Sequence, residues 1–140
     1  MGKLESSQAS IGFYGDDLDP SEITLALGKP TVGVGKGEPW VNEYGREITA
    51  KTGSWRLVAK PGEPAELDWQ INDLLSRLND DLGAWRSLAG RYRGRVFCGL
   101  FLASQNDGLT LRPETLVRIG ERGLVIDLDI YGPVQSEPDV

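Results

Sequence analysis

Four stretches of the chain alternate apolar and polar residues, and they span residues 9–14, 54–60, 96–103 and 124–131. A period of two puts every second side chain on the same side of an extended backbone, so each stretch predicts a β-strand with one buried face. In the last stretch the predicted inner face carries Leu124, Ile126, Leu128 and Ile130.

Three further stretches place apolar residues at helical spacing. Residues 20–27 follow Asp19, a good N-cap, and begin with Pro20, while Glu22 is at the position that completes a capping box. Residues 65–89 predict a long helix, which breaks in two if the polar run near Asn79 caps a second start. A third helix is expected from Pro113 to Gly123, with Leu116 and Ile119 facing inward.

Residues 29–53 contain too many glycines and prolines for a helix, and they predict a long irregular connection with one short strand at 31–34. Functional residues are often found in such loops. Residues 29–60 also carry a local charge of +3, with Lys29, Lys36, Arg46, Lys51, Arg56 and Lys60 against Glu38, Glu43 and Glu47.

The order strand, helix, loop, strand, long helix, strand, helix, strand predicts an α+β fold, a two-layer sandwich with helices on one face of a mainly antiparallel sheet. The expected topology is ferredoxin-like with a C-terminal helix–strand addition. The predicted domain organisation is a flexible N-terminal tail (1–8), a single α+β domain (9–132) and a flexible C-terminal tail (133–140).

The net charge of −6 argues against a general affinity for nucleic acid or for an anionic membrane surface. The chain contains no histidine, which excludes histidine-based catalytic triads and the usual zinc sites, and no cofactor is expected. Cys98, the single cysteine, falls on an apolar strand and is expected to be buried rather than reactive. The longest apolar run, residues 100–103, is too short to span a bilayer, and with no signal pattern a cytoplasmic location is expected.

Three motifs together resemble a bacterial family of uncharacterised domains numbered 4279. They are GDDLDPSEIT at residues 15–24, KTGSW at 51–55 and GLVIDLDIY at 123–131, and the resemblance covers about residues 10–131. The family implies a small bacterial domain, with no established activity, substrate or cofactor to carry over. The chain departs from the family pattern at Arg112, where other members have a serine before the proline that starts the third helix.

Four aspartates form one candidate site: Asp16, Asp17, Asp127 and Asp129. Carboxylate oxygens suit Mg²⁺ or Ca²⁺, and paired carboxylates can divide acid and base roles. The alternative is that the first two end a strand in a solvated turn and the last two point outward from a strand. If the fold brings the two pairs together they make a candidate site, and if they lie apart the structural interpretation holds.

A second candidate site is the outer face of the predicted sheet, which mixes charged and aromatic residues: Arg93, Arg95, Phe97, Phe101, Asp127, Asp129 and Tyr131. The arginines can bind a partner, or they can pair with the aspartates across neighbouring strands. The favoured hypothesis is a non-enzymatic protein-binding module, either immunity-type or homodimeric, with a protein partner or a second copy on this face. The alternative is a carboxylate-dependent Mg²⁺ or Ca²⁺ hydrolase.

Overall fold

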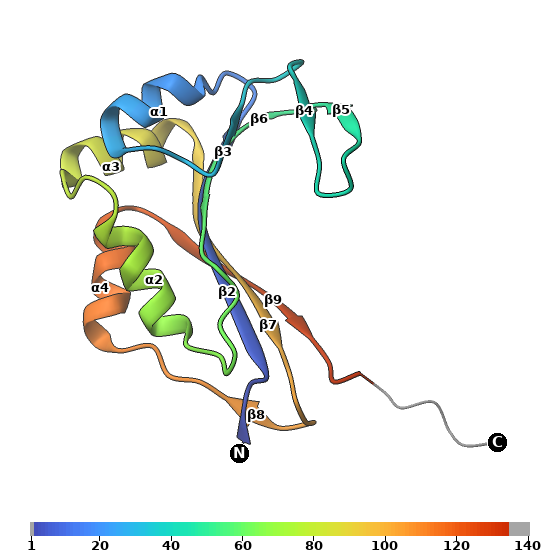
Figure 1. Cartoon of the computed structure of the whole chain (residues 1–140). Coiled ribbons are helices and arrows are strands. Elements are labelled where there is room, and N and C mark those ends of the chain that lie inside the picture. Colours follow the sequence, from blue (N-terminus) through green and yellow to red (C-terminus); the bar gives the residue numbers. More distant parts are fainter. Residues whose placement is uncertain (1, 135–140) are drawn as a thin grey trace.

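The computed structural model describes residues 2–134 as one sheet with helices packed against it (Figure 1). In chain order the elements are β1 (Gly2–Lys3), β2 (Ser6–Gly15), α1 (Pro20–Leu27), β3 (Val32–Val34), β4 (Pro39–Val41), β5 (Glu47–Thr49), β6 (Gly53–Val58), α2 (Leu67–Ser76), α3 (Leu82–Arg91), β7 (Arg93–Phe101), β8 (Asp107–Gly108), α4 (Pro113–Glu121) and β9 (Val125–Tyr131). Four strands lie outside the main sheet, in two small two-stranded sheets: β1 pairs with β8, and β4 pairs with β5.

The main sheet has five strands in the order β3-β6-β2-β7-β9. β2 is central and pairs antiparallel with both β6 and β7, while β3 pairs antiparallel with β6. β2 and β3 therefore run in the same direction with β6 between them, which is the split βαβ arrangement of ferredoxin-like folds. β9 follows α4 and pairs parallel with β7. The predicted α+β sandwich with a C-terminal helix–strand addition is confirmed.

All four helices cover one face of this sheet, and the core lies between the two layers (Figure 1). The strand faces that point into the core follow the period of two, as predicted. In the central strand Ile11 and Phe13 are fully buried, and Phe13 pairs in register with Trp55 of β6. Trp85 of α3 packs on the same phenyl ring, with 6.0 Å between the ring centroids.

α1 begins as its sequence predicts. The Asp19 carboxylate accepts a hydrogen bond from the Ser21 amide, and Pro20 occupies the first turn. The predicted capping box is wrong, because the Glu22 carboxylate does not turn back to the cap but forms an ion pair with Arg91 at the end of α3. Glu22 therefore connects α1 to α3 instead of capping its own helix.

The N-terminal segment is not a tail. β2 begins at Ser6, and its first residues pair with the end of β7. Leu4 and Ser7 are only 4% and 1% exposed, because Leu4 joins the core and Ser7 lies under α2. The prediction failed because polar residues hide the alternation there. Of the predicted C-terminal tail, residues 135–140 lie outside the described residues.

The stretch predicted as one long helix is two, α2 and α3, and Asp81 caps the second by accepting from the Ala84 amide. In α4 the inward positions are Thr115 and Ile119, whereas Leu116, predicted to face inward, is 47% exposed. α4 presents Thr115 to α2 because the hydroxyl has partners there, including Asp68 at 2.6 Å.

The inner face of β9 is less buried than its alternation predicts. Leu128 and Ile130 are 54% and 56% exposed, although Cys98 and Leu100, opposite them in β7, are buried. β9 is the outermost strand, so its side chains border solvent on the side that has no neighbouring strand. Cys98 is buried as predicted, and this burial, reinforced by Asp127, raises the pKa of its thiol to about 12.

Asp68 holds α4 against α2, and this contact predicts a pH-dependent stability. Burial alone raises the pKa of Asp68, but hydrogen bonds from the Thr115 hydroxyl and from the amide and side chain of Arg112 outweigh it, so the pKa is lowered. A carboxyl whose pKa is lower in the folded state stabilises the fold above its unfolded pKa, and this contribution is lost as the pH falls through the folded pKa.

We expect Asp68→Asn to lower the free energy of unfolding by about 2 kcal/mol at pH 7, because a charged acceptor of three hydrogen bonds is replaced. The difference from the wild type should shrink as the pH falls below about 4, where the wild-type carboxyl also becomes neutral. Urea unfolding at several pH values measures this. Asp73→Asn, on the same helix but in an exposed ion pair with Arg77, is the matched control and should change little at any pH. A pH-independent difference for Asp68→Asn would contradict the assignment.

No helix of the described residues is both long enough and apolar enough to cross a membrane.

Candidate functional site

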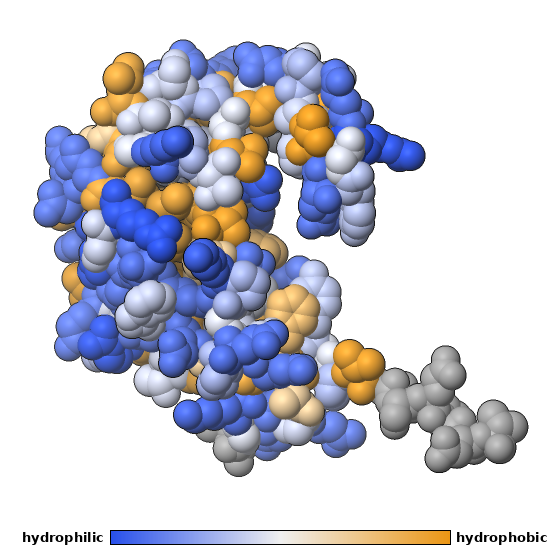
Figure 2. All heavy atoms as spheres, in the orientation of Figure 1, coloured by the Kyte–Doolittle hydropathy of each residue, from blue (hydrophilic) through white to orange (hydrophobic). Residues whose placement is uncertain are grey.

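No helix of residues 2–134 covers the second face of the sheet, and one hairpin overhangs it. β4 and β5 pair antiparallel and project from the edge that holds β3 (Figure 1). The turn between them is fixed locally, because the Asn42 side chain accepts from the amides of Tyr44 and Arg46, and Gly45 adopts a positive φ of 76°. The segment predicted as an irregular connection therefore contains an ordered hairpin, and Figure 2 shows the hollow that it leaves beside the sheet.

Hydrogen bonds close the base of the hairpin. The amides of Gly37 and Ala50 bridge the two arms, each at 2.9 Å from a carbonyl oxygen of the other arm. The Glu38 carboxylate accepts from the Gly35 amide at 2.9 Å. The two arms are thus joined close to the point where the chain leaves β3.

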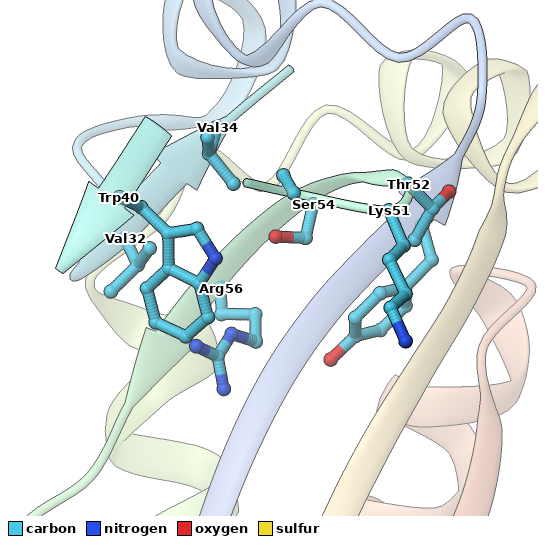
Figure 3. Close-up of a pocket in the computed structure, with 9 residues that line it drawn as sticks. Val32, Val34, Trp40, Lys51, Thr52, Ser54 and Arg56 are labelled. Carbon is cyan, nitrogen blue, oxygen red and sulfur yellow. The ribbon is translucent and has the colours of Figure 1, made fainter. Parts of the chain in front are cut away.

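The hollow under the hairpin has a volume of about 270 Å³. Its lining comes from β2, β3, β6 and the hairpin: Tyr14, Val32, Val34, Trp40, Ala50, Lys51, Thr52, Ser54 and Arg56. Figure 3 shows the Trp40 ring on one side of the hollow and Lys51 on the other, with Ser54 and Arg56 rising from β6 between them. Val32 and Val34 lie on the Trp40 side with Arg56 next to the indole, and Thr52 lies on the Lys51 side.

Arg56 is central to the open face, because it also lines two adjoining hollows. One, of about 230 Å³, lies over the lower sheet beside Phe97 and Tyr131. The other, of about 580 Å³, lies on the far side of Trp40. Within residues 2–134 no side-chain hydrogen bond or ion pair engages the Arg56 guanidinium. No described ion pair neutralises its charge, although Asp129 and Glu43 line the two adjoining hollows with it. We call the three hollows together the groove.

Arg95 has a different environment. Its guanidinium lies over the rings of Tyr14 and Phe97, at 4.7 and 4.8 Å from their centroids, and it donates to Asp127 at 3.0 Å. Burial alone lowers the pKa of Arg95, but the hydrogen bonds to Tyr14 and Asp127 outweigh it, so the pKa is raised. Of the two interpretations of the face, the cross-strand arginine–aspartate pairing is present at Arg95.

The two pairs of aspartates lie apart. Asp127 is opposite Phe97, which pairs with Ser10 of β2, whereas Asp16 follows the last residue of that strand. At about 3.3 Å per residue, Gly15 is roughly 17 Å along the strand from Ser10. Asp16 instead contacts Thr52 and Lys36, which together lower its pKa. Within the described part of the chain, no group of three or more acidic or thiol side chains lies close enough to hold a metal ion.

The remaining predicted residues occupy the lower sheet and one upper position. Phe101 and Tyr131 stack at the lower end with 4.8 Å between centroids, and the Tyr131 hydroxyl donates to Asp129 at 2.6 Å. Arg93 is exposed at the top of β7, over the Tyr14 ring. Asp17 contributes only its carbonyl, at 3.5 Å from the Tyr92 hydroxyl. The residues predicted on the outer face of the sheet therefore share one surface, and the Asp16–Asp17 turn lies apart from it.

None of the nine residues that line the hollow was in the predicted site, including the three that set its chemistry, Trp40, Lys51 and Arg56. Trp40 and Lys51 come from the glycine- and proline-rich stretch 29–53, and all three come from the positively charged stretch 29–60. These two features were the available signal in the sequence. The alternation of β6 also placed Arg56 on the outer face. Nothing in the sequence indicated that the hairpin turns back over that face.

A model of one protein family matches residues 5–133, nearly the whole chain. The chain belongs to the family DUF4279. The family is described as a domain of unknown function, so the DUF4279 match identifies the domain and leaves its activity open. Searches of curated proteins and of solved structures gave no match.

Proposed function

We propose that this DUF4279 domain is a non-enzymatic interaction module that docks a partner protein on the open face of its sheet. The observation that carries the proposal is the one-sided packing of the fold. All four helices cover one face, while the other face is left uncovered and is hollowed beneath the β4–β5 hairpin (Figures 1 and 2).

The composition of this face supports a protein partner. Arginine and aromatic side chains are enriched where proteins bind each other and where most of the binding energy arises. The face presents Tyr14, Trp40, Arg56, Phe97 and Tyr131 around the connected hollows.

The outer edge of β9 borders the open face, and no strand of residues 2–134 pairs with it. Val125, Leu128 and Ile130 are each more than half exposed along this edge, Val125 on the open side of the sheet and the other two on the helix side. Such an edge can accept an extended segment of another chain. Asp127 and Asp129 alternate with them, so a second β9 running antiparallel would place like charges close together. The edge therefore favours a different protein, and a second copy would have to dock on the face itself.

The charge of the hollow favours an acidic partner. Asp127 is paired with Arg95, whereas Arg56 is free among the described residues, so the hollow beneath the hairpin presents net positive charge. An immunity-type module and a homodimer both remain forms of this proposal, and the cytoplasmic location stays a prediction. The carboxylate-dependent hydrolase lacks support, because its four aspartates lie in two separate places with separate partners.

Site-specific photo-crosslinking tests the proposal. A photoreactive residue placed at Val58 or Val125, on the open face and its edge, should give an ultraviolet-dependent adduct of one defined mass in cells that contain the partner. The same residue at Ser87, exposed on α3, is the control and should give none. Mass spectrometry of the adduct distinguishes a second copy from another protein, and light scattering of the purified chain checks the homodimer.

The identified protein, purified, should then bind the wild type and lose affinity for Arg56→Gln. Adducts at neither open-face position, or equal adducts at Ser87, would overturn the proposal.

A further inference from the structure

We infer that the hollow beneath the β4–β5 hairpin binds an oxyanion, a carboxylate or a phosphate, that is attached to a flat apolar body. This inference rests on the proposed function, because it assigns the chemistry that the open face recognises in its partner. Four features of the hollow support it: a cation without a partner, the positive charge of the lining residues, an apolar side and the volume.

Arg56 is one free cation of the hollow. Seven other arginines donate side-chain hydrogen bonds to acceptors in the described part of the chain: Arg77, Arg86, Arg91, Arg95, Arg112, Arg118 and Arg122. Arg46, Arg56 and Arg93 have no such bond among residues 2–134, and of these three Arg56 lines the hollow. A guanidinium presents a planar fork of donors that matches the geometry of a carboxylate or phosphate.

The rest of the lining adds positive charge and hydrogen-bond donors. Lys51 lies across the hollow from Trp40, and the hydroxyls of Tyr14 and Ser54 also line it (Figure 3). None of the nine described residues that line the hollow is acidic, on a chain with 21 acidic residues and a net charge of −6. A concave surface lined by charge of one sign concentrates the field, so this hollow attracts anions that the rest of the protein repels.

The side of the hollow opposite Lys51 is largely apolar. Val32 and Val34 lie there with the Trp40 indole, which hangs from the hairpin beside Arg56 (Figure 3). Ala50 is a further apolar residue of the lining. An aromatic ring or another planar group can stack on the indole while its acid group reaches the guanidinium. The volume of about 270 Å³ holds one ring with its acid group, which is smaller than a typical drug-sized site.

The lining suits an oxyanion, and it does not distinguish between the molecules that can carry one. An acidic or C-terminal carboxylate of a partner protein and a phosphorylated side chain present the same planar or tetrahedral oxygens to Arg56. The experiment therefore uses small probes of both kinds with the same aromatic body: 3-phenylpropionate, phenyl phosphate, and the neutral 3-phenylpropionamide.

The readout is the indole N–H signal of Trp40 in the ¹H–¹⁵N spectrum of the full chain, identified by its loss in Trp40→Phe. At least one oxyanion should shift this signal saturably, while the amide should not. Arg56→Gln should weaken that binding about tenfold or more, because a hydrogen bond to a charged group is lost. Arg77→Gln, on α2 and away from the hollow, is the matched control and should bind as the wild type does.

A shift by the carboxylate alone, the phosphate alone, or both supports the inference and assigns the source. Equal binding of the amide, equal binding by Arg56→Gln, or no shift at about 10 mM of either oxyanion would overturn it, provided that signals outside the groove show an intact fold. The probe titration involves no partner protein. A negative titration beside successful crosslinking would therefore overturn the oxyanion site alone. A negative crosslinking experiment would leave a positive titration valid.

Discussion

Trp85→Ala is expected to lower the free energy of unfolding by about 3–5 kcal/mol, the cost of deleting a fully buried aromatic side chain. Trp85 is 0% exposed and lies where α3 meets the sheet. Its ring packs on Phe13, and its indole nitrogen donates to the Asn79 carbonyl at 2.6 Å. The guanidinium of Arg122, itself only 3% exposed, lies 5.5 Å from the ring centroid. Alanine would leave a cavity, an unpaired carbonyl and a buried cation without its aromatic neighbour.

Urea unfolding followed by circular dichroism measures this loss. Trp69→Ala, at a position of α2 that is 63% exposed, is the matched control and should cost less than about 1 kcal/mol. Trp85→Phe should fall between the two, because it keeps most of the packing and loses the hydrogen bond. Equal losses for Trp85→Ala and Trp69→Ala would show that α3 does not depend on its buried ring.

Gln70→Leu is expected to cost about 2–4 kcal/mol, although it exchanges a polar side chain in the core for an apolar one of similar length. Gln70 is 3% exposed, and its side chain forms hydrogen bonds with two separate backbone segments. Its amide nitrogen donates to the carbonyls of Ser7 and Lys60, and its carbonyl oxygen accepts from the Ser7 hydroxyl. Leucine would leave the Ser7 hydroxyl without its acceptor and the Lys60 carbonyl without this donor, and a buried group left without a partner costs about 1–3 kcal/mol. The Ser7 carbonyl would keep its second donor, the Gly62 amide.

Gln8→Leu is the matched control, because Gln8 donates to one carbonyl, that of Ala59, from the half-buried open face. Water can replace that donor, so the loss should be below about 1 kcal/mol. Hydrogen exchange adds a local measurement, since Gln70→Leu should accelerate exchange of the Ser7 amide, which bonds to Gly62 at the start of β2. A Gln70→Leu variant as stable as Gln8→Leu would mean that the network contributes nothing to holding the N-terminal segment.

The elements were largely predictable because their causes are local. A period of two marked the core strands, the start of α1 lay in Asp19 and Pro20, and Asp81 marked the break between α2 and α3. The order of these elements restricted the topology enough for the α+β sandwich to be predicted, and the uncovered outer face followed from it. The Arg95–Asp127 pair was within reach of the same argument, because both residues alternate outward on strands that became neighbours.

The remaining features depend on which segments meet in space. The Ser7–Gln70 network joins residues 63 positions apart, and it turned an apparently polar tail into part of the sheet. Leu128 and Ile130 alternate like core residues, yet the outermost position of β9 leaves them exposed. The Asp16–Asp17 turn is separated from Asp127 by about half the length of the central strand.

The groove depends on the tertiary structure in the same way. Trp40, Lys51 and Arg56 have no local reason to share a site, and they do so because the hairpin turns back over β3 and β6. Periodicity and capping record the interactions of a residue with its near neighbours in sequence, so the chain alone determined its strands, its helices and their order. Burial at the edge and the composition of a cavity depend on distant segments, so only the folded chain decided them.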